Sequence, residues 1–542
     1  MQIRRDKHHR PAILSLIALT LAAFGWNVPP AVAVDNEGLI VSTSGGRLQG
    51  VARSSGRAEF LGIPYAQPPV GNLRWHEPVE MKPWSGVRDA STFGAPCAQS
   101  VLGDWNKHDA ETSKEDCLFL NVIAPVWPIK SKLPVMLWLH GGANAGGTAS
   151  SALYKDGTLV QHGIVLVTVN YRLGIFGFFA HPELTRESPH KASGNYGLMD
   201  QIAALRWVRQ NIAAFGGDPE NITVFGQSAG AQDTSLLMTS PVAKNLFHRA
   251  IAESGSAFML LLPPLTKAEQ SGEALAARLK APAGTESLAY LRNLSVSELL
   301  QAASVQDPKT PPMLGPIVDG HVLSQNPAEV FSAGEESPIP MIVGSTTREF
   351  GVTAPPDELR KMIEEFSGDL APKALALYGL ANGGQGTSDP LYGPAGNQWL
   401  ADQIFRCPVT TQAMSHHAAH HPTFEYQFER AIPGQEAEGS VHSADLPYVF
   451  GYYPRTGNIS GKFGDIDFKI ADWIERYWTT FAKTGNPNGG SLPDWPEFGA
   501  SQTFIELTED GHVLVRSGGL RRDQCDLSRE ILHRRIGDAK GK

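Results

Sequence analysis

The strongest constraint on the fold of this chain is a regular alternation of short apolar runs with helical patterns. Residues 133–139 read "LPVMLWL", residues 163–172 read "GIVLVTVNYR" and residues 221–225 read "NITVF". Such runs are typical of strands buried on both faces. Between the last two, "GLMDQIAALRWVRQNIAAFG" has apolar residues at helical spacing and ends at Gly216. This alternation predicts an α/β fold with a central, mainly parallel sheet that is covered by helices on both faces.

Three later runs extend the predicted sheet. They are "HRAIAES" at residues 248–254, "IPMIVGS" at 339–345 and "TFEYQFER" at 423–430, the last of which alternates in polarity. Helical patterns dominate residues 266–307 and 357–421. We expect these two stretches to be inserted helices that roof the sheet.

Bulk composition excludes some classes of function. Hydrophobic residues make up 42% of the chain, which is enough for a large core, and the formal net charge is −9. A nucleic-acid partner would require a basic face, and the sequence shows none. We therefore expect no nucleic-acid partner.

The N-terminus has the pattern of a secretory signal peptide. A basic start, "MQIRRDKHHR", is followed by the short apolar run "AILSLIALTLAAFGW" and by "AVAV" at residues 31–34. Cleavage after Ala33 would leave residues 34–542 as a single domain without a later membrane span, secreted or periplasmic. An N-terminal membrane anchor is the alternative, although the apolar run is short for a bilayer.

The segment "GQSAG" at residues 226–230 places a serine where a strand must turn sharply into a helix. Gly226 and Gly230 remove side chains that would collide in this turn. Ser228 would then sit in strained backbone geometry at the carboxyl edge of the sheet, with its hydroxyl exposed. In a chain with 55 glycines the pattern also arises by chance, so a catalytic role depends on finding the other groups.

Donors for an oxyanion are available in "WLHGGANAGG", which follows a buried strand. The backbone N–H groups of Gly142 and Ala143 carry no bulky side chain, and with Ala229 they would form a three-donor oxyanion hole. The alternative is an ordinary glycine-rich connection.

A general base and an acid follow in the order serine, acid, histidine. Glu349 lies in a loop after the run at 339–345, and His442 lies in a loop after the run at 423–430. Asp445 is the rival acid, but a spacing of three residues from a histidine is more typical of a local structural hydrogen bond. Glu349 could also be a solvated loop residue.

With these motifs in place, the chain resembles the type-B carboxylesterases, the family that includes the cholinesterases and the bacterial p-nitrobenzyl esterases. The matching segments run in order through the chain: "FLGIPYAQPPVGNLRW", "EDCLFLNV", "WLHGGANAGG", "NYRLGIFGF", "NITVFGQSAG", "GPIVDG", "HSADLPYVFG" and "TTFAKTGNPNG". The resemblance implies an α/β-hydrolase fold with a roofed active-site gorge. It also implies a carboxylesterase acting on small-molecule esters, and we expect no cofactor or metal. With the signal peptide and with Gln227, discussed below, this predicts a secreted enzyme for neutral esters.

The same resemblance implies roles for individual residues. Ser228 would be the nucleophile, Glu349 the acid and His442 the base. Gly142, Ala143 and Ala229 would be the oxyanion donors.

Four cysteines behind a signal peptide suggest two disulfides, and four cysteines allow three pairings. The family resemblance implies the pairs Cys97–Cys117 and Cys407–Cys525.

Departures from the family pattern bear on substrate choice. Gln227 stands where cholinesterases carry glutamate, so a cationic choline ester loses an anionic partner. By family analogy the methyl group of Ala143 crowds the acyl carbon and disfavours esters of tertiary alcohols. Asn144 replaces the usual aromatic residue and is expected to make the pocket wall polar.

Other functions remain open. A lipase activated at an interface would use the Cys97–Cys117 loop as a lid, but this loop is mostly polar in sequence. A non-catalytic adhesion module would lack a complete triad. The run "SHHAAHH" pairs His416 with His420 and His417 with His421 at helical spacing. No acidic partner accompanies them, so we expect an exposed helix end and not a metal site.

Overall fold

The computed structural model describes residues 39–304, 312–453 and 461–540, with the side chains of 538–540 excepted. Asn36–Lys542 forms one compact unit. The predicted signal peptide and its cleavage site lie outside the described residues. Within those ranges, no helix is both long enough and apolar enough to cross a membrane.

An eleven-stranded sheet organises this unit. In spatial order its strands are β16 (Val513–Arg516), β15 (Phe504–Leu507), β14 (Thr423–Phe428), β11 (Met341–Thr346), β10 (Arg249–Glu253), β9 (Gly217–Gln227), β7 (Leu133–Leu139), β8 (Val165–Val169), β6 (Phe119–Ala124), β4 (Ala58–Pro64) and β3 (Val51–Ala52). Neighbours from β15 to β8 pair in parallel, and the strands at the two ends pair antiparallel. The carboxyl ends of the parallel strands therefore share one edge, where catalytic loops of α/β folds collect.

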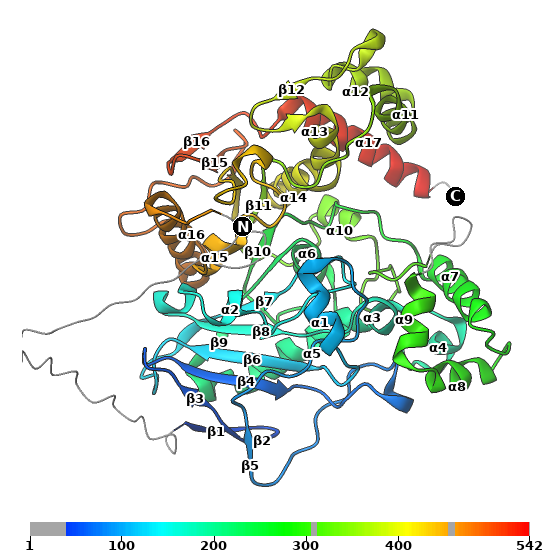
Figure 1. The fold of residues 1–542 in the computed structure, drawn as a ribbon, viewed down its shortest axis with the longest axis vertical. Helices are drawn as coiled ribbons and strands as arrows, with labels where there is room; N and C mark the ends of the chain where they lie inside the picture. The colour runs from blue at the N-terminus through cyan, green and yellow to red at the C-terminus, as the bar shows by residue number, and fades with distance from the viewer. Residues whose placement is uncertain (1–38, 305–311, 454–460, 541–542) are drawn as a thin grey trace, which may run out of the picture. The chain divides into compact units, whose positions relative to one another are not determined.

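Helices fill the connections between the strands, and Figure 1 shows them around the sheet. The α-helices are α1 (Lys107–Thr112), α2 (Ala152–Lys155), α3 (Gly174–Phe178), α4 (Pro182–Glu187), α5 (Tyr196–Asn211), α6 (Ala229–Thr239), α7 (Leu265–Arg278), α8 (Glu286–Asn293), α9 (Val296–Ser304), α10 (Pro327–Ala333), α11 (Pro356–Ser367), α12 (Ala371–Leu377), α13 (Ala395–Ala401), α14 (Cys407–Ala418), α15 (Leu446–Phe450), α16 (Asp465–Thr484) and α17 (Arg522–Lys540). The two stretches predicted to be helical contain α7 to α9 and α11 to α14. Short strands β1 (Ile40–Thr43), β2 (Gly46–Gln49) and β5 (Val87–Asp89) form a small separate sheet, and β12 (Ser388–Asp389) pairs with β13 (Gly393–Pro394).

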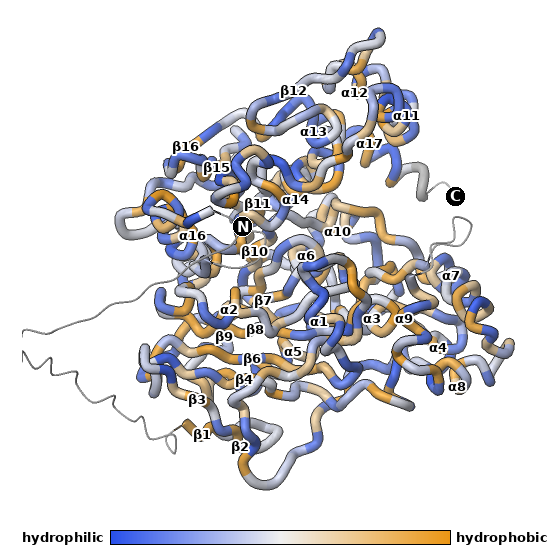
Figure 2. Tube along the Cα trace, viewed as in Figure 1, coloured by the Kyte–Doolittle hydropathy of each residue, from blue (hydrophilic) through white to orange (hydrophobic). Residues whose placement is uncertain are grey.

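The central strands are buried on both faces, as their continuous apolar runs predict. In β7, Val135, Leu137 and Leu139 pack into the core cluster that contains α5 and α6. Met136 and Trp138, which alternate with them, pack into a second cluster with α15 and α16. Figure 2 shows the hydrophobic colours along the central strands and hydrophilic ones along outer helices such as α11. The predicted α/β fold with a doubly covered, mainly parallel sheet is confirmed.

Strand β14 differs from its sequence pattern. Its alternating polarity suggests one exposed face, yet all six residues are buried. Glu425 accepts a hydrogen bond from the Thr410 hydroxyl at 2.6 Å, and burial raises the pKa of Glu425 to about 7. Strands β15 and β16 continue the sheet beyond it, because tertiary pairing extends a sheet through residues with weak periodicity.

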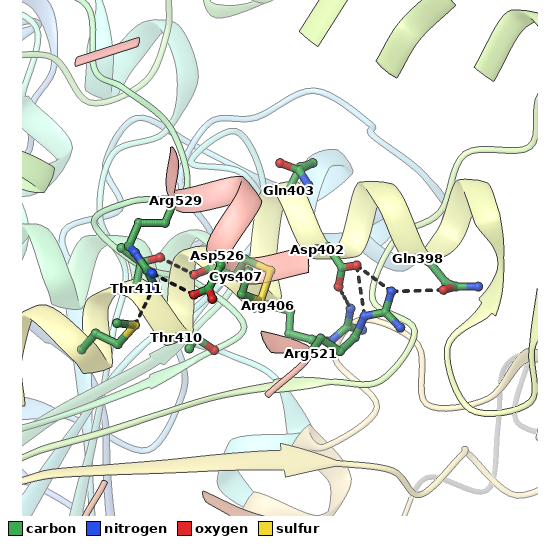
Figure 3. Close-up of a disulfide and its surroundings, with 12 residues drawn as sticks. Gln398, Asp402, Gln403, Arg406, Cys407, Thr410, Thr411, Arg521, Asp526 and Arg529 are labelled. Atoms are coloured by element: carbon green, nitrogen blue, oxygen red, sulfur yellow. Dashed lines mark hydrogen bonds and ion pairs between the residues drawn. A yellow bond between two sulfur atoms is a disulfide. The ribbon is translucent and has the colours of Figure 1, made fainter. Parts of the chain in front are cut away.

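Two disulfides, Cys97–Cys117 and Cys407–Cys525, pair all four cysteines. The second joins α14 to α17. Beside it, Asp402 forms ion pairs with Arg406 and Arg521, and Arg521 also donates to Gln398 at 3.1 Å (Figure 3). Because Arg406 also donates to the Thr347 carbonyl, this buried network links the C-terminal helix to the loop after β11.

The two disulfides should differ in their contribution to stability. Cys407 and Cys525 are 118 residues apart, and Cys97 and Cys117 are 20 apart. In the chain-entropy account, loops of these lengths contribute about 5 and about 3 kcal/mol. We expect the Cys407→Ser, Cys525→Ser double variant to lose more unfolding free energy in equilibrium denaturation than Cys97→Ser, Cys117→Ser. Equal losses of unfolding free energy would contradict the chain-entropy ordering.

The pairing of all four cysteines has its own test. Titration of the denatured, unreduced protein with a thiol reagent should give no signal.

Candidate functional site

Ser228 occupies the sharp turn between β9 and α6. Its backbone angles are φ 58° and ψ −123°, a region that costs a non-glycine residue about 1–3 kcal/mol. Hydrogen bonds hold the turn: Ser228 N–H donates to the Glu253 carbonyl, and Gln232 N–H donates to the Ser228 carbonyl, both at 2.9 Å. The side chain is half-buried at the carboxyl edge of the sheet, where the predicted turn was expected to present it.

Glycine is required on both sides of Ser228 because backbone packs there. A Cβ atom on Gly226 would lie 2.5 Å from the Gly230 carbonyl group, and one on Gly230 would lie 2.0 Å from the Leu139 oxygen of β7. A Cβ atom on Gly141 would lie 3.1 Å from the Ser228 Cβ atom. The loop after β7 is therefore in direct contact with the Ser228 turn.

That loop provides free N–H groups. Gly142, Ala143 and Asn144 have positive φ values of 111°, 56° and 54°, and N–H groups of Ala145 and Gly146 close the turn onto the Gly142 carbonyl at 3.0 Å. In the described part of the chain, the Gly142 and Ala143 N–H groups donate to no protein acceptor. Ala229 begins α6, where the first N–H groups have no intrahelical partner. All three predicted donors thus lie next to Ser228.

Asn144 does not form a pocket wall. It is 2% exposed, and its amide donates to Asp233 at 3.0 Å. The second Asp233 oxygen accepts from Gln201 at 2.6 Å. Burial raises the pKa of Asp233 to about 7, although the two amide donors lower it. The expected polar wall is wrong: the amide is turned toward a buried carboxyl group on α6 and ties the loop to that helix.

The acid and base predicted from chain order meet in the structure. Glu349 follows β11, is 3% exposed and has a positive φ of 32°. His442 Nδ1–H donates to Glu349 Oε2. Glu349 Oε1 accepts from the Ser254 hydroxyl at 2.6 Å and from the Thr346 N–H at 2.9 Å.

These donors keep Glu349 ionised. Burial opposes ionisation, but the charge of His442 and the hydrogen bonds from His442, Ser254 and Thr346 outweigh it, so the Glu349 pKa is lowered. Sequence reasoning misses Ser254. Its position directly after β10, between the carboxyl ends of β9 and β11, is the signal that could have identified it.

Backbone and aromatic contacts fix the position of His442. Arg348 N–H donates to the Ser440 carbonyl at 2.9 Å, and His442 N–H donates to the Glu349 carbonyl at 3.3 Å. The imidazole ring packs against Phe350 and Phe405, with ring centroids 4.3 and 4.7 Å away, and the two phenyl rings also contact each other. The imidazole is therefore held by two aromatic contacts and by the hydrogen bond at Nδ1.

The remaining imidazole nitrogen contacts Gln227. Since the carboxylate can only accept from Nδ1–H, Nε2 of the neutral ring carries the lone pair, and the Gln227 amide donates to it at 3.1 Å. Among the described contacts, Ser228 Oγ makes no hydrogen bond to His442. Such bonds are often loose before substrate binds, and here the neighbouring amide occupies the position.

Asp445 is not the partner of His442. Its carboxyl group accepts from the Tyr426 hydroxyl at 3.1 Å, and burial together with the Glu349 charge raises the Asp445 pKa to about 6. Glu253 lies in the same buried region and accepts from the Trp478 indole at 2.6 Å. Burial and the charge of Asp445 raise the Glu253 pKa well above its ordinary value. The geometry pairs the imidazole with Glu349 alone.

An apolar cavity of about 550 Å³ lies near these loops. Its lining includes Phe258 and Leu260 from the chain after β10, Ile404 next to Phe405, and Ile531 and Arg535 from α17. None of Ser228, Glu349 and His442 lines it, but two of its walls continue directly into segments that contact them. Two aromatic residues expected in the roof differ in position. Trp105 is 59% exposed, and a Cβ atom added to Gly142 would lie 3.1 Å from its ring. Tyr392 lies beneath the guanidinium groups of Arg406 and Arg521, 4.6 and 4.5 Å away.

Comparison with known proteins identifies the family of the chain. The profile of the carboxylesterase family matches residues 37–527. The chain is 36% identical to fumonisin B1 esterase of Sphingopyxis macrogoltabida over 520 residues, covering 92% of each protein. It is 35% identical to cocaine esterase of Homo sapiens over 492 residues, covering 84% of each. It is also 34% identical over 488 residues to a medium-chain fatty acyl-CoA hydrolase precursor of Anas platyrhynchos, covering 83% of this chain and 84% of that protein.

These matches span nearly all of the chain that forms the α/β unit, and they agree with the family predicted from the collinear motifs. The chain belongs to the carboxylesterase family and is a carboxylic ester hydrolase.

Proposed function

We propose that this enzyme hydrolyses neutral carboxylic esters through Ser228, His442 and Glu349 and an acyl-enzyme intermediate. The observation that carries the proposal is the ionised Glu349 on His442 Nδ1, next to a serine on a strained turn with free N–H groups beside it. An imidazole oriented in this way can accept a proton at Nε2. For Ser228 to transfer its proton, its hydroxyl must replace the Gln227 amide as the hydrogen-bond donor to His442 Nε2.

The chemistry proceeds in two stages. Ser228 Oγ attacks the ester carbonyl carbon while its proton passes to His442 Nε2, and the oxyanion accepts hydrogen bonds from Gly142, Ala143 and Ala229. The C–O bond to the alcohol then breaks, and the alcohol leaves with the proton from Nε2. Water attacks the acyl group in the same way, giving its proton to Nε2, and the acid leaves as Ser228 is restored.

Location and processing are part of the same proposal. We infer that residues 1–33 are a signal peptide and that residues 34–542 form the single mature domain, secreted or periplasmic. Both disulfides support an oxidising compartment, because cytosolic thiols are kept reduced.

The proposed substrates are small esters with an uncharged alcohol part. Gln227 is neutral where an anion would attract a cation, and the cavity between Phe258 and Ile404 is largely apolar. Relatives named for fumonisin B1, cocaine and fatty acyl-CoA share the family. Because these names refer to different substrates, family membership does not specify the ester, and we expect the lining of the pocket to determine it.

A lipase is the second candidate, and one observation favours it. The loop between Cys97 and Cys117 looks mostly polar in sequence, but Val101, Leu102 and Trp105 are 56%, 49% and 59% exposed. They gather next to the oxyanion loop, since a Cβ atom on Gly146 would lie 2.9 Å from Leu102. Interfacial activation would appear as a rise in rate when a soluble ester passes its solubility limit and forms an emulsion.

Replacing the nucleophile tests the mechanism. Ser228→Ala should lower kcat by roughly 10⁴-fold or more, because both covalent steps need Oγ. The thermal unfolding midpoint should not fall, since alanine preserves the turn. An organophosphate should label the wild-type enzyme once, and peptide mapping should find the adduct on Ser228. An adduct on another residue, or an active Ser228→Ala variant, would refute the assignment.

The pH dependence follows from the base. Imidazole accepts a proton only when neutral, and histidine titrates near pH 6.5 in model peptides. Glu349 stays ionised through this range because its pKa is lowered. We therefore expect kcat/KM to rise with pH through the histidine range and then to level off. A rate that is flat from about pH 5 to about pH 9, with chemistry rate-limiting, would argue against a histidine base.

Asp445→Asn is the matched control, because the Asp445 pKa of about 6 lies in the same window. The variant should keep the acid limb of kcat/KM. In the unfolded chain an aspartate titrates near pH 3.9, so the raised native pKa stabilises the fold below that pH. This stability is lost as the pH rises toward about 6. Asp445→Asn should remove that part of the decline in unfolding free energy, measured by denaturant titration at several pH values.

Selectivity tests the interpretation of Gln227. Two aromatic side chains at the site are exposed, Trp105 by 59% and Phe350 by 54%, and a cation–π contact at an exposed ring is worth about 0.5–1 kcal/mol. We expect butyl butyrate to have a higher kcat/KM than butyrylcholine at fixed ionic strength. Gln227→Glu should shift the ratio toward the choline ester. A tenfold wild-type preference for butyrylcholine would mean that another residue provides a cation site.

A further inference from the structure

Far from the catalytic edge, three side chains converge on one point. Glu336 Oε1 lies 2.7 Å from His416 Nδ1 and 3.3 Å from His421 Nδ1, and the two Nδ1 atoms are 3.3 Å apart. Glu336 and His416 are buried, and the His421 side chain is 15% exposed. Three ligand atoms that approach from different segments in this way match the donor set of a divalent metal ion.

Local structure explains why these two histidines meet. Helix α14 ends in a Schellman motif: His420 has φ 63°, His421 N–H donates to the His416 carbonyl, and His420 N–H donates to the His417 carbonyl. This ending brings the His421 side chain, three residues beyond the end of the helix, back onto its last turn, and the His416 and His421 rings lie 4.7 Å apart. The i, i+4 spacing of a helix predicts the pairs His416–His420 and His417–His421 instead. No acidic residue lies nearby in the sequence, and the acidic partner, Glu336, comes from the chain before β11.

The hydrogen bonds favour a cation between the three ligands. His416 Nε2 lies 2.8 Å from the Ile339 carbonyl, which can only accept, so Nε2 carries the proton. In the neutral ring, Nδ1 then points a lone pair at the Glu336 carboxylate and at His421 Nδ1. A carbonyl that orients the far nitrogen of a histidine is the usual support of a metal ligand. Glu336 Oε2 is also buried without a partner among the described residues.

The distances suit zinc. Zinc–nitrogen and zinc–oxygen bonds of about 2.0–2.1 Å in tetrahedral geometry place ligand atoms about 3.3 Å apart. Two of the three separations have this value, and the third is the length of a hydrogen bond. Imidazole ligands suit zinc and its neighbours in the first transition row, whereas magnesium and calcium prefer oxygen.

We propose that Glu336, His416 and His421 form a three-ligand site for a zinc-type divalent cation, with water in the fourth tetrahedral position. The site lies at the amino edge of the sheet: Glu336 precedes β11 and His421 precedes β14, two strands that pair in parallel with Met341 opposite Thr423. Glu349 and His442 follow the carboxyl ends of the same two strands. The ion would clamp the starts of both strands and the end of α14, and it takes no part in ester hydrolysis.

Zinc binding to the full-length, chelator-treated protein tests the proposal. We expect one zinc per chain in competition with a chromophoric chelator, and a thermal unfolding midpoint that rises with zinc concentration. His421→Ala should weaken binding at least tenfold and remove the rise. Glu336→Gln keeps the shape of the side chain and should weaken binding in the same direction, so the test stands even if one variant folds poorly. Cobalt bound in place of zinc should give a visible tetrahedral absorption band that both variants lose.

His420→Ala is the matched control, because it removes a histidine from the same segment that lies outside the cluster. It should bind zinc as the wild type does. Other histidines, such as the stacked surface pair His190 and His321, contribute equally to all variants. Absence of zinc binding at 100 μM would identify the cluster as a buried imidazolium–carboxylate pair and overturn the proposal. Equal binding by wild type and His421→Ala would overturn it too. Esterase activity is not a readout, so these outcomes are independent of the catalytic assignment.

Discussion

The structure around the catalytic edge depends on one steric constraint, the contact of bare backbone between the end of β9 and the end of β7. Gly230 leaves no room for a Cβ atom beside the Leu139 carbonyl, and Gly141 packs on the Ser228 Cβ atom. Because the two segments touch, Ser228 is forced into a left-handed conformation at the same place where the next loop presents its N–H groups. The proposed nucleophile and the proposed oxyanion donors thus depend on a single packing contact, stabilised by the hydrogen bond from Ser228 N–H to β10.

Three buried carboxyl groups near this turn differ in the direction in which their pKa values are shifted. Glu349 has an imidazole, a hydroxyl and a backbone N–H as donors, and its pKa is lowered. Among the described side-chain contacts, Asp445 and Glu253 have one donor each. Burial and the charge of Glu349 raise the pKa of Asp445, and burial and the charge of Asp445 raise that of Glu253. A low-dielectric region favours one well-compensated charge over three. The number of donors, and not distance along the chain, decides which carboxylate orients the base.

Much of the fold and the site follows from local pattern. Apolar runs located the central strands, "GQSAG" located the strand–turn–helix, and chain order located Glu349 and His442. Reasoning from sequence failed where a side chain's partner is remote. Asn144 looks like a pocket residue until Asp233, 89 residues away, takes up its amide. The histidines of "SHHAAHH" look solvated until a helix ending turns His421 onto His416 and the chain before β11 brings Glu336.

The sequence by itself determined the order of the strands along the chain, the glycine positions of the turn and the family, because these depend on periodicity and on residues that few alternatives can replace. Only the tertiary structure decided which carboxyl group meets His442, that Gln227 occupies its Nε2, and that Glu336 joins two histidines. Such pairings depend on the register between parallel strands that are distant in sequence. Burial then selects among polar groups by how many hydrogen-bond partners each one finds, a quantity that exists only once the chain has folded.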